Sequence, residues 1–129
     1  MKGNQLRRLM KKKKSFLGVF ARECVPKKVK NLPAGFIFNN ENSNLGGEHW
    51  LAVFITKKGK WIFFDSYGLP STAYGLGKML SFPFQVQHPE MKTCGLHAVY
   101  FLHHMMDGHV PPYSIDLYSN ECKIKKYFD

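Results

Sequence analysis

The sequence predicts an α+β fold in a single domain, residues 1–129. Residues 50–56 and 61–66 are β-branched and aromatic runs on either side of Lys-Lys-Gly-Lys, which predicts a β-hairpin. Residues 93–106 have helical length and apolar side chains nearly all round, which predicts a central buried helix. With 44% apolar and 15% aromatic residues, the chain can bury a core without disulfides. We expect a mostly antiparallel sheet packed on that helix.

The N-terminal half gives four further expectations. Residues 4–14 predict a short basic helix capped by Asn4. Residues 24–33 contain two prolines and three lysines, which predicts an exposed connector, and residues 34–39 predict a short buried strand. Residues 39–47 are rich in Asn, Ser and Gly, and should form a loop that brings His49 to the next strand.

The hairpin should be central, because both of its runs are apolar on both faces. Its simplest register places Asp65 opposite Ala52, so a contact between Asp65 and His49 requires residues 46–47 to curl over the strand end. Farther on, residues 72–80 predict a weak helix, and residues 82–87 a strand limited at its start by a proline. Thr93 should cap the buried helix, and residues 114–118 should form a short helix before a basic tail.

The net charge is +10, and eleven of the nineteen Lys and Arg residues lie within the first thirty positions. The run Lys11, Lys12, Lys13 and Lys14 is the densest part of this excess. Localised positive charge favours a polyanion such as DNA as a partner, or a nuclear address. A solvated basic surface without a partner is the alternative, and it stays open at this point.

Cys24, Cys94 and Cys122 are odd in number and unequally spaced, unlike a secreted disulfide framework. No apolar run approaches the roughly 20 residues that span a bilayer. We expect a monomer without a membrane partner, inside the cell or packaged in a particle made there, in the nucleus or a virion.

Cysteine protease chemistry needs a thiolate, an imidazole to accept its proton, a carboxylate to orient the imidazole and a donor for the oxyanion. Cys94 begins the buried helix, where the exposed N–H groups favour a thiolate. His49 precedes a strand, and Asp65 interrupts an apolar one, where an unpaired carboxylate would be costly. Gln87 precedes the helix and could join the Cys94 N–H in binding the oxyanion, with Gln85 as the other candidate.

Each residue has a plainer interpretation. Cys94 could be a small buried side chain, His49 a loop histidine and Gln87 a surface glutamine. Cys94, His97 and His104 could instead bind zinc, although no Cys-x-x-Cys or His-Glu-x-x-His pattern supports such a site, and we predict no metal.

Several motifs closely resemble the adenovirus endopeptidase (adenain) family, and more broadly its clan, which includes the SUMO and other ubiquitin-like-protein peptidases. They cover most of the chain, in the family's order: Phe-Leu-Gly-Val at 16–19, Gly-Gly-Glu-His-Trp at 46–50, Phe-Phe-Asp-Ser-Tyr-Gly at 63–68, Val-Gln-His-Pro at 86–89, Cys-Gly-Leu at 94–96 and Phe-Leu-His at 101–103.

The resemblance implies a cysteine-protease fold with Cys94 as nucleophile, His49 as general base and acid, Asp65 as orienting carboxylate and Gln87 as oxyanion donor. It also implies that Trp50 and Gly47 contact substrate, and that cleavage follows small residues, as in Gly-Gly or Gly-X sequences. The sequence requires no cofactor, whereas the family uses DNA and an activating peptide joined by a disulfide. No cysteine lies between Asp65 and Cys94, which argues against a covalent peptide here. DNA would bind at residues 11–14.

The expected function is therefore a cysteine endopeptidase that matures capsid proteins of a virus or of a virus-like transposon of the Maverick/Polinton type. One alternative is a deconjugating peptidase for SUMO or another ubiquitin-like modifier. A second, from another class, is a catalytically silent module that binds DNA or a capsid.

Overall fold

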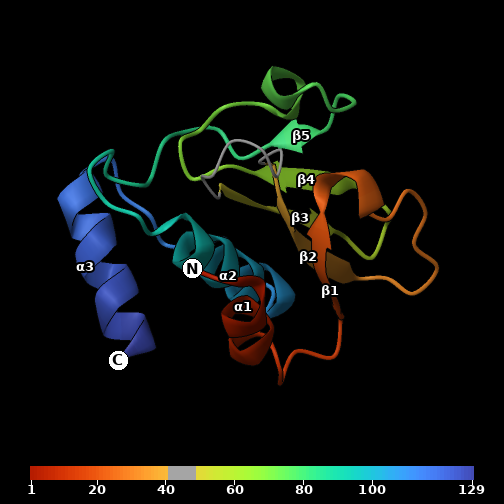
Figure 1. Ribbon diagram of the computed structural model, residues 1–129, viewed down its shortest axis with the longest axis horizontal. Coiled ribbons are helices and arrows are strands. Elements are labelled where there is room, and N and C mark those ends of the chain that lie inside the picture. Colours follow the sequence, from red (N-terminus) through yellow and green to blue (C-terminus); the bar gives the residue numbers. More distant parts are fainter. Residues whose placement is uncertain (41–48) are drawn as a thin grey trace.

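The computed structural model describes residues 1–40 and 49–129, and in them the chain forms a mixed α+β fold (Figure 1). The helices are α1 (Gly3–Leu9), α2 (Cys94–Met106) and α3 (Leu117–Phe128), with short 3-10 turns η1 (Arg22–Cys24) and η2 (Ser71–Tyr74). The strands are β1 (Phe16–Ala21), β2 (Ala34–Asn39), β3 (Trp50–Ile55), β4 (Trp61–Phe64) and β5 (Leu80–Ser81).

The five described strands form one sheet in the order β1-β2-β3-β4-β5. The two central pairings, β2 with β3 and β3 with β4, are antiparallel, whereas both outer pairings are parallel. The sheet is thus mixed, and the expected mostly antiparallel sheet is corrected on this point. All six residues of β3 are buried, which confirms the central position predicted for the hairpin.

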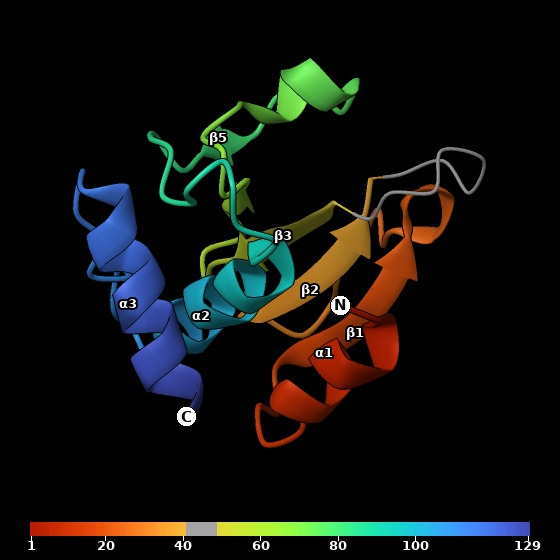
Figure 2. The same ribbon diagram turned by 60° about the vertical axis from the view of Figure 1, so that its left-hand side comes forward.

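The pleat of the strands divides the core into two layers. In β2, Ile37 faces the layer formed with α1 and α2, while Phe36 and Phe38 face the layer formed with the connector and residues 74–79. Figure 2 shows α1 and α2 on the same side of the sheet. A Cβ at Gly35 would lie 2.7 Å from Met106, so a glycine there permits the close approach of α2 to β2.

The hairpin register differs by one residue from the simplest one. Ala52 pairs with Phe64, so Asp65 lies just past the end of the described pairing rather than opposite Ala52. The predicted curl of residues 46–47 falls outside the described residues.

Some elements differ from those predicted. The first helix is Gly3–Leu9 with Lys2 at its N-cap, shorter than 4–14 and not capped by Asn4, and the lysine run lies in the turns that follow it. Residues 82–87 form no strand, and the strand expected there is instead the two-residue β5. The weak helix predicted at 72–80 is the single turn η2.

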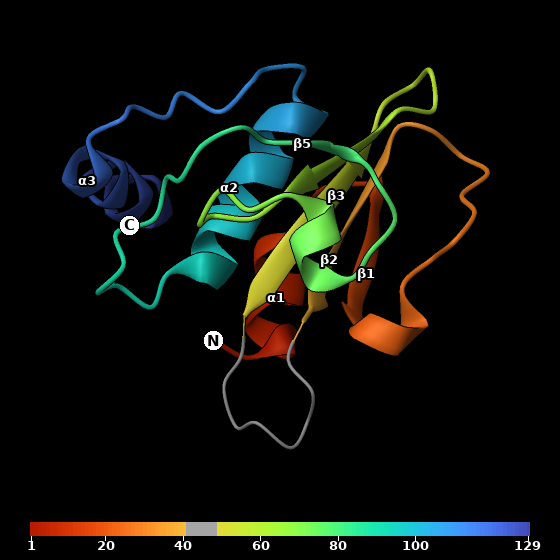
Figure 3. The ribbon, with the colours of Figure 1, turned by 90° about the horizontal axis from the view of Figure 1, so that it is seen from above.

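The C-terminal helix differs most from the sequence prediction. Residues 114–118 were expected to form a short helix, but α3 runs from Leu117 to Phe128, and the side chain of Asp116 caps it by accepting from the Tyr118 N–H. Only Asn120 and Ile124 of α3 are buried, so this helix adds little to the core. In Figures 1 and 3, α2 lies between α3 and the sheet.

Candidate active site

Three of the predicted site residues meet where β3 begins and β4 ends. His49 directly precedes β3 and Asp65 directly follows β4, and because these strands are antiparallel neighbours, both residues lie at the same edge of the sheet. Cys94 is the first residue of α2, and its Sγ accepts a hydrogen bond from the Trp50 N–H at 3.5 Å. The sheet and the helix therefore bring together residues that are 16 and 29 positions apart.

Asp65 is almost fully buried, and its carboxylate is satisfied on both oxygens. Oδ1 lies 2.9 Å from His49 Nε2 and accepts from the Tyr67 N–H at 3.0 Å. Oδ2 accepts from the Tyr74 hydroxyl and from the Leu69 N–H at 3.3 Å. The buried partner that the sequence suggested for Asp65 is thus His49, supported by the turn after β4.

His49 Nε2 lies 2.9 Å from Asp65 Oδ1, and His49 is close enough to Cys94 for each group to shift the pKa of the other. The rings of Tyr67 and Tyr74 stack on its imidazole, with centroids at 5.2 and 6.0 Å. These contacts hold the ring in one orientation. The carboxylate–imidazole–thiol order is the one that nucleophilic cysteine chemistry requires.

The electrostatics favour a thiolate beside an imidazolium. Burial opposes protonation of His49, but hydrogen bonds to Asp65 and Cys94 outweigh it and raise the pKa of His49 to about 9. Burial also opposes ionisation of Cys94, but its pKa is lowered by the hydrogen bond with His49 and by the Trp50 and Gly95 N–H groups. Asp65 is buried too, yet hydrogen bonds from His49 and Tyr74 lower its pKa.

Gln87 is buried, unlike the surface glutamine of the plainer interpretation. Its Oε1 accepts from the Ser66 hydroxyl at 2.5 Å, and its Nε2 donates to the Met91 carbonyl at 2.6 Å and to the Tyr67 hydroxyl at 3.2 Å. Since a backbone carbonyl can only accept, the Met91 contact fixes which end of the amide carries nitrogen. Both amide hydrogens are therefore engaged, and the Tyr67 contact is the longer.

Tyr67 is a site residue that the sequence reasoning missed. Its oxygen accepts from Gln87, and among the described residues nothing accepts the hydrogen of its own hydroxyl. Burial raises the pKa of Tyr67, and so does the charge of Cys94 nearby. In the sequence, the only signal for a role of Tyr67 was its position two residues after Asp65 and directly before Gly68. Gly68 has φ +78°, and a Cβ there would lie 2.5 Å from the Gln85 nitrogen.

A second missed feature is the carboxylate of Glu121 on α3. It accepts from the Thr93 hydroxyl at 2.8 Å and from the His88 N–H at 3.0 Å, and lies 2.9 Å from His97 Nε2. His97 is fully buried, and its Nδ1 lies 2.7 Å from the Tyr113 hydroxyl. Thr93 was expected to cap α2, but its side chain makes no capping bond. Glu121 thus ties α3 to both ends of the segment between Gln87 and Cys94.

A cavity of about 600 Å³ opens beside these groups. Its lining comes from the N-terminal residue, the strand ends, the segment before α2 and the start of α2: Met1, His49, Tyr67, Gln87, Pro89, Glu90, Met91, Lys92, Cys94 and Gly95. The thiol, the imidazole, the amide and the phenol therefore face one space. A polypeptide carbonyl placed in it would have a nucleophile and hydrogen-bond donors on the same side.

Of the predicted substrate contacts and the alternative oxyanion donor, the two described residues, Trp50 and Gln85, do not present their side chains to the site. Trp50 is buried, and its indole N–H donates to the Met1 carbonyl at 2.9 Å, so its contact with the site is through its backbone N–H. Gln85 is exposed and donates to the Gln87 carbonyl at 3.0 Å. Gly47 lies outside the described residues.

The four lysines predicted to bind nucleic acid lie together after α1, but they differ in whether they form an ion pair. Lys13 pairs with Asp107 at 2.8 Å, whereas Lys11, Lys12 and Lys14 are exposed. Arg8 and Lys11–Lys13 line a cavity of about 430 Å³ with Leu9, His103 and Tyr127.

The residues of the zinc alternative do not share a site. His97 is engaged by Tyr113 and Glu121, and His104 Nδ1 lies 2.9 Å from the Tyr100 carbonyl of its own helix. Within residues 1–40 and 49–129, no group of three or more His, Cys, Asp and Glu side chains is placed to hold a metal ion.

No protein-family model matches the chain, and no curated protein matches its sequence. In the part of the chain that the structure describes, no helix is long and apolar enough to cross a membrane.

Proposed function

We propose that this protein is a cysteine endopeptidase of the adenain type, with Cys94 as nucleophile, His49 as general base and acid and Asp65 as the orienting carboxylate. One observation carries the proposal: His49 lies 2.9 Å from buried Asp65, and it interacts with the Cys94 thiol so that the pKa of His49 is raised and that of Cys94 lowered. The sequence motifs that resemble the adenain family support the same assignment. The structure is a mixed α+β fold, and the cysteine-protease fold is part of the proposal.

In the proposed reaction, the Cys94 thiolate attacks the substrate carbonyl and forms a tetrahedral oxyanion. The oxyanion lies at the cavity wall formed by Gln87 and Tyr67, where the Tyr67 hydroxyl and the Cys94 N–H can donate to it. Gln87 donates to it by exchanging its longer bond, the one to Tyr67, for one to the oxyanion. His49 then protonates the leaving amine, and the resulting thioester is hydrolysed by water that His49 activates. Asp65 stabilises the imidazolium throughout and keeps its charge.

We propose that the substrate is an extended polypeptide cut after small residues, of the Gly-Gly or Gly-X type, and that the task is maturation of viral or transposon capsid proteins. The assignment of substrate rests on the family resemblance. A capsid-precursor peptide and an electrophilic probe made from a ubiquitin-like modifier distinguish this task from deconjugation, according to which one reacts at Cys94.

Competitive alkylation of the three cysteines tests the proposal directly. Cys24 and Cys122 are exposed, whereas Cys94 is partly buried, so accessibility alone predicts that Cys94 reacts last. A lowered thiol pKa predicts that it reacts first. Limiting iodoacetamide at neutral pH, read by peptide mass spectrometry, should label Cys94 ahead of the other two. Labelling in the order of exposure would contradict the proposed nucleophile.

A second candidate, binding of DNA by the lysine run, is favoured by the basic cavity after α1. Backbone phosphates would pair with Lys11, Lys12 and Lys14, and affinity would fall steeply with added salt. Replacement of these three by Ala should abolish retention of duplex DNA, while Cys94→Ala should leave it unchanged. DNA binding that is lost in the Cys94 variant would contradict a separate basic site.

A further inference from the structure

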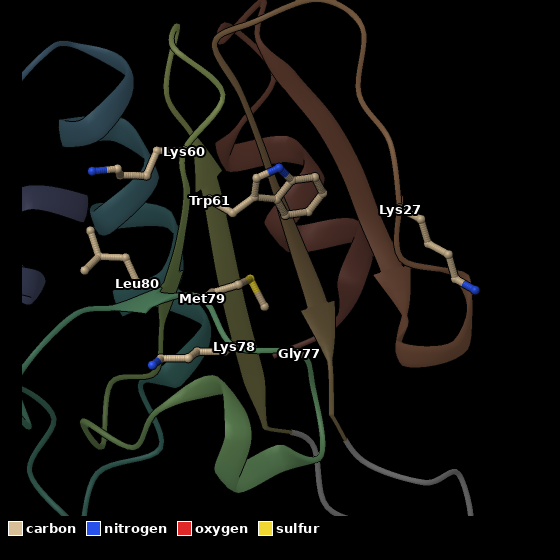
Figure 4. A pocket seen from close by; sticks show the side chains of 7 residues that line it. All are labelled: Lys27, Lys60, Trp61, Gly77, Lys78, Met79 and Leu80. Atoms are coloured by element: carbon tan, nitrogen blue, oxygen red, sulfur yellow. The ribbon is translucent and has the colours of Figure 1, made fainter.

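A second hollow, of about 720 Å³, lies on the sheet away from the candidate active site. It sits at the beginning of β4, whereas Asp65 follows the end of that strand. Figure 4 shows Trp61 of β4 above Met79 on its floor, with the side chain of Leu80 of β5 directed to the other side of these strands. Leu80 is 57% exposed, a large fraction for a strand leucine. We name this surface, which consists of residues 27, 60, 61 and 77–80, the β4–β5 hollow.

Three lysines from separate segments line the hollow, and Figure 4 shows their side chains at its edges, directed away from Trp61 and Met79. Lys27 comes from the connector, Lys60 from the hairpin turn and Lys78 from the chain before β5. Among the described residues, no carboxylate pairs with any of them, although Lys13 elsewhere does form an ion pair. The only acid between residues 50 and 81 is Asp65, which is buried against His49. The rim of the hollow therefore carries uncompensated positive charge.

The floor also offers a directional donor. The indole N–H of Trp61 has no acceptor among the described residues, whereas the other tryptophan, Trp50, donates to the Met1 carbonyl. Trp61 packs edge-on against Phe36, with the ring centroids 6.1 Å apart, so the core fixes the position of the indole. A ligand with an apolar group for Trp61 and Met79, an acceptor for the indole N–H and negative charges for the lysines would satisfy all three features.

We propose that the β4–β5 hollow binds an acidic polypeptide segment of another protein, with an apolar side chain as its anchor. Carboxylates match the three separated ammonium groups, and a peptide carbonyl or carboxylate matches the indole donor. Trp61 is the only aromatic residue in the lining, whereas single-stranded nucleic acid is held by successive stacked aromatic side chains. The apolar floor thus favours a peptide over an oligonucleotide.

Fluorescence anisotropy of a labelled acidic peptide with a central Leu, added to the Cys94→Ala protein, tests this proposal without any turnover. The triple variant Lys27→Glu, Lys60→Glu, Lys78→Glu should weaken binding by about tenfold or more. The matched control, Lys30→Glu, Lys57→Glu, Lys58→Glu, changes the same charge at exposed lysines outside the lining. Equal weakening by both triples would overturn the proposal, because it would show attraction by net charge alone.

Two further arms test the floor and the class of ligand. Replacing the central Leu of the peptide by Gly, or Met79 of the protein by Ser, should each weaken binding several-fold, and Trp61→Phe should remove the change in tryptophan fluorescence on binding. Circular dichroism must show that each variant keeps its fold. An oligothymidine that binds the hollow more tightly than the peptide would overturn the assignment to a peptide. Since the assay uses Cys94→Ala, its outcome is independent of the proposed protease activity.

Discussion

Thr93, the residue before Cys94, donates its hydroxyl hydrogen to the carboxylate of Glu121 at 2.8 Å. The same carboxylate accepts from the backbone N–H of His88, the residue after Gln87. A single side chain on α3 therefore holds both ends of the segment that joins the proposed oxyanion donor to the proposed nucleophile. We infer that Glu121 is a positioning residue for the oxyanion wall.

Replacing Glu121 by Gln should lower kcat by about ten- to a hundredfold, because a misplaced donor stabilises the oxyanion poorly. The amide keeps the size of the side chain but has one accepting oxygen for three donors. Burial raises the pKa of Glu121, but the hydrogen bonds from His97, Thr93 and His88 outweigh it and lower the pKa overall, so the wild-type carboxyl is ionised at neutral pH. Steady-state kinetics on a peptide substrate gives kcat and KM separately.

The control for Glu121→Gln is the pH dependence of Cys94 alkylation, which should not move, because His49 and not Glu121 sets the thiolate. Glu23→Gln, an exposed change on η1, should leave both quantities at their wild-type values. A shift of the alkylation profile equal to the loss in kcat would show that Glu121 acts on the nucleophile instead.

Alkylation of Cys94 should depend on pH through two groups. The thiolate is lost as pH falls through the lowered pKa of Cys94, so reactivity drops on the acid side. The His49 imidazolium, raised to a pKa of about 9, loses its proton as pH rises through that value, so the ion pair is confined to the interval between them. His49→Ala should move the reactivity of Cys94 toward that of an ordinary thiol near pH 8.5. Rates measured with iodoacetamide in a pH series check this, and an unchanged profile in His49→Ala would remove the basis for the pair.

Gln87 and Tyr67 should contribute unequally to the reaction. Gln87→Ala should reduce kcat by about 10²–10³, the usual loss for one oxyanion donor. Tyr67→Phe removes only the phenolic oxygen and its hydrogen, and should reduce kcat about tenfold while keeping the ring on His49. Full activity in Tyr67→Phe would show that the Tyr67 hydroxyl is not needed and that Gln87 alone donates to the oxyanion from this wall.

Gly68→Ala should destabilise the fold and the site together. The residue has a positive φ, and the added Cβ would lie 2.5 Å from the backbone nitrogen of Gln85, which is not a flexible neighbour. We expect a loss of about 1–3 kcal/mol in the free energy of unfolding, from strain in the turn that carries Tyr67. Urea denaturation followed by circular dichroism measures it. Gly77→Ala is the matched control, since a Cβ there meets nothing within 4 Å.

Local patterns in the sequence were sufficient for the elements that are buried on both sides. β2 and β3 and the helix from Cys94 to Met106 were predicted nearly to their ends, because continuous apolar runs of those lengths have few alternatives. The same patterns failed at β5 and α3, which bury little apolar surface of their own and form because they pack on elements already in place.

The sequence by itself determined that a thiol, an imidazole, a carboxylate and an amide occur at element ends where chemistry is possible. Only the tertiary structure decided which of them meet. The antiparallel pairing of β3 with β4 brings His49 to Asp65, and the packing of α2 on β3 brings Cys94 to both. Of the supporting groups, Tyr67 has only its place after Asp65 as a local signal and Glu121 has none, because hydrogen bonds between residues 20 to 33 positions apart exist only once the chain has folded.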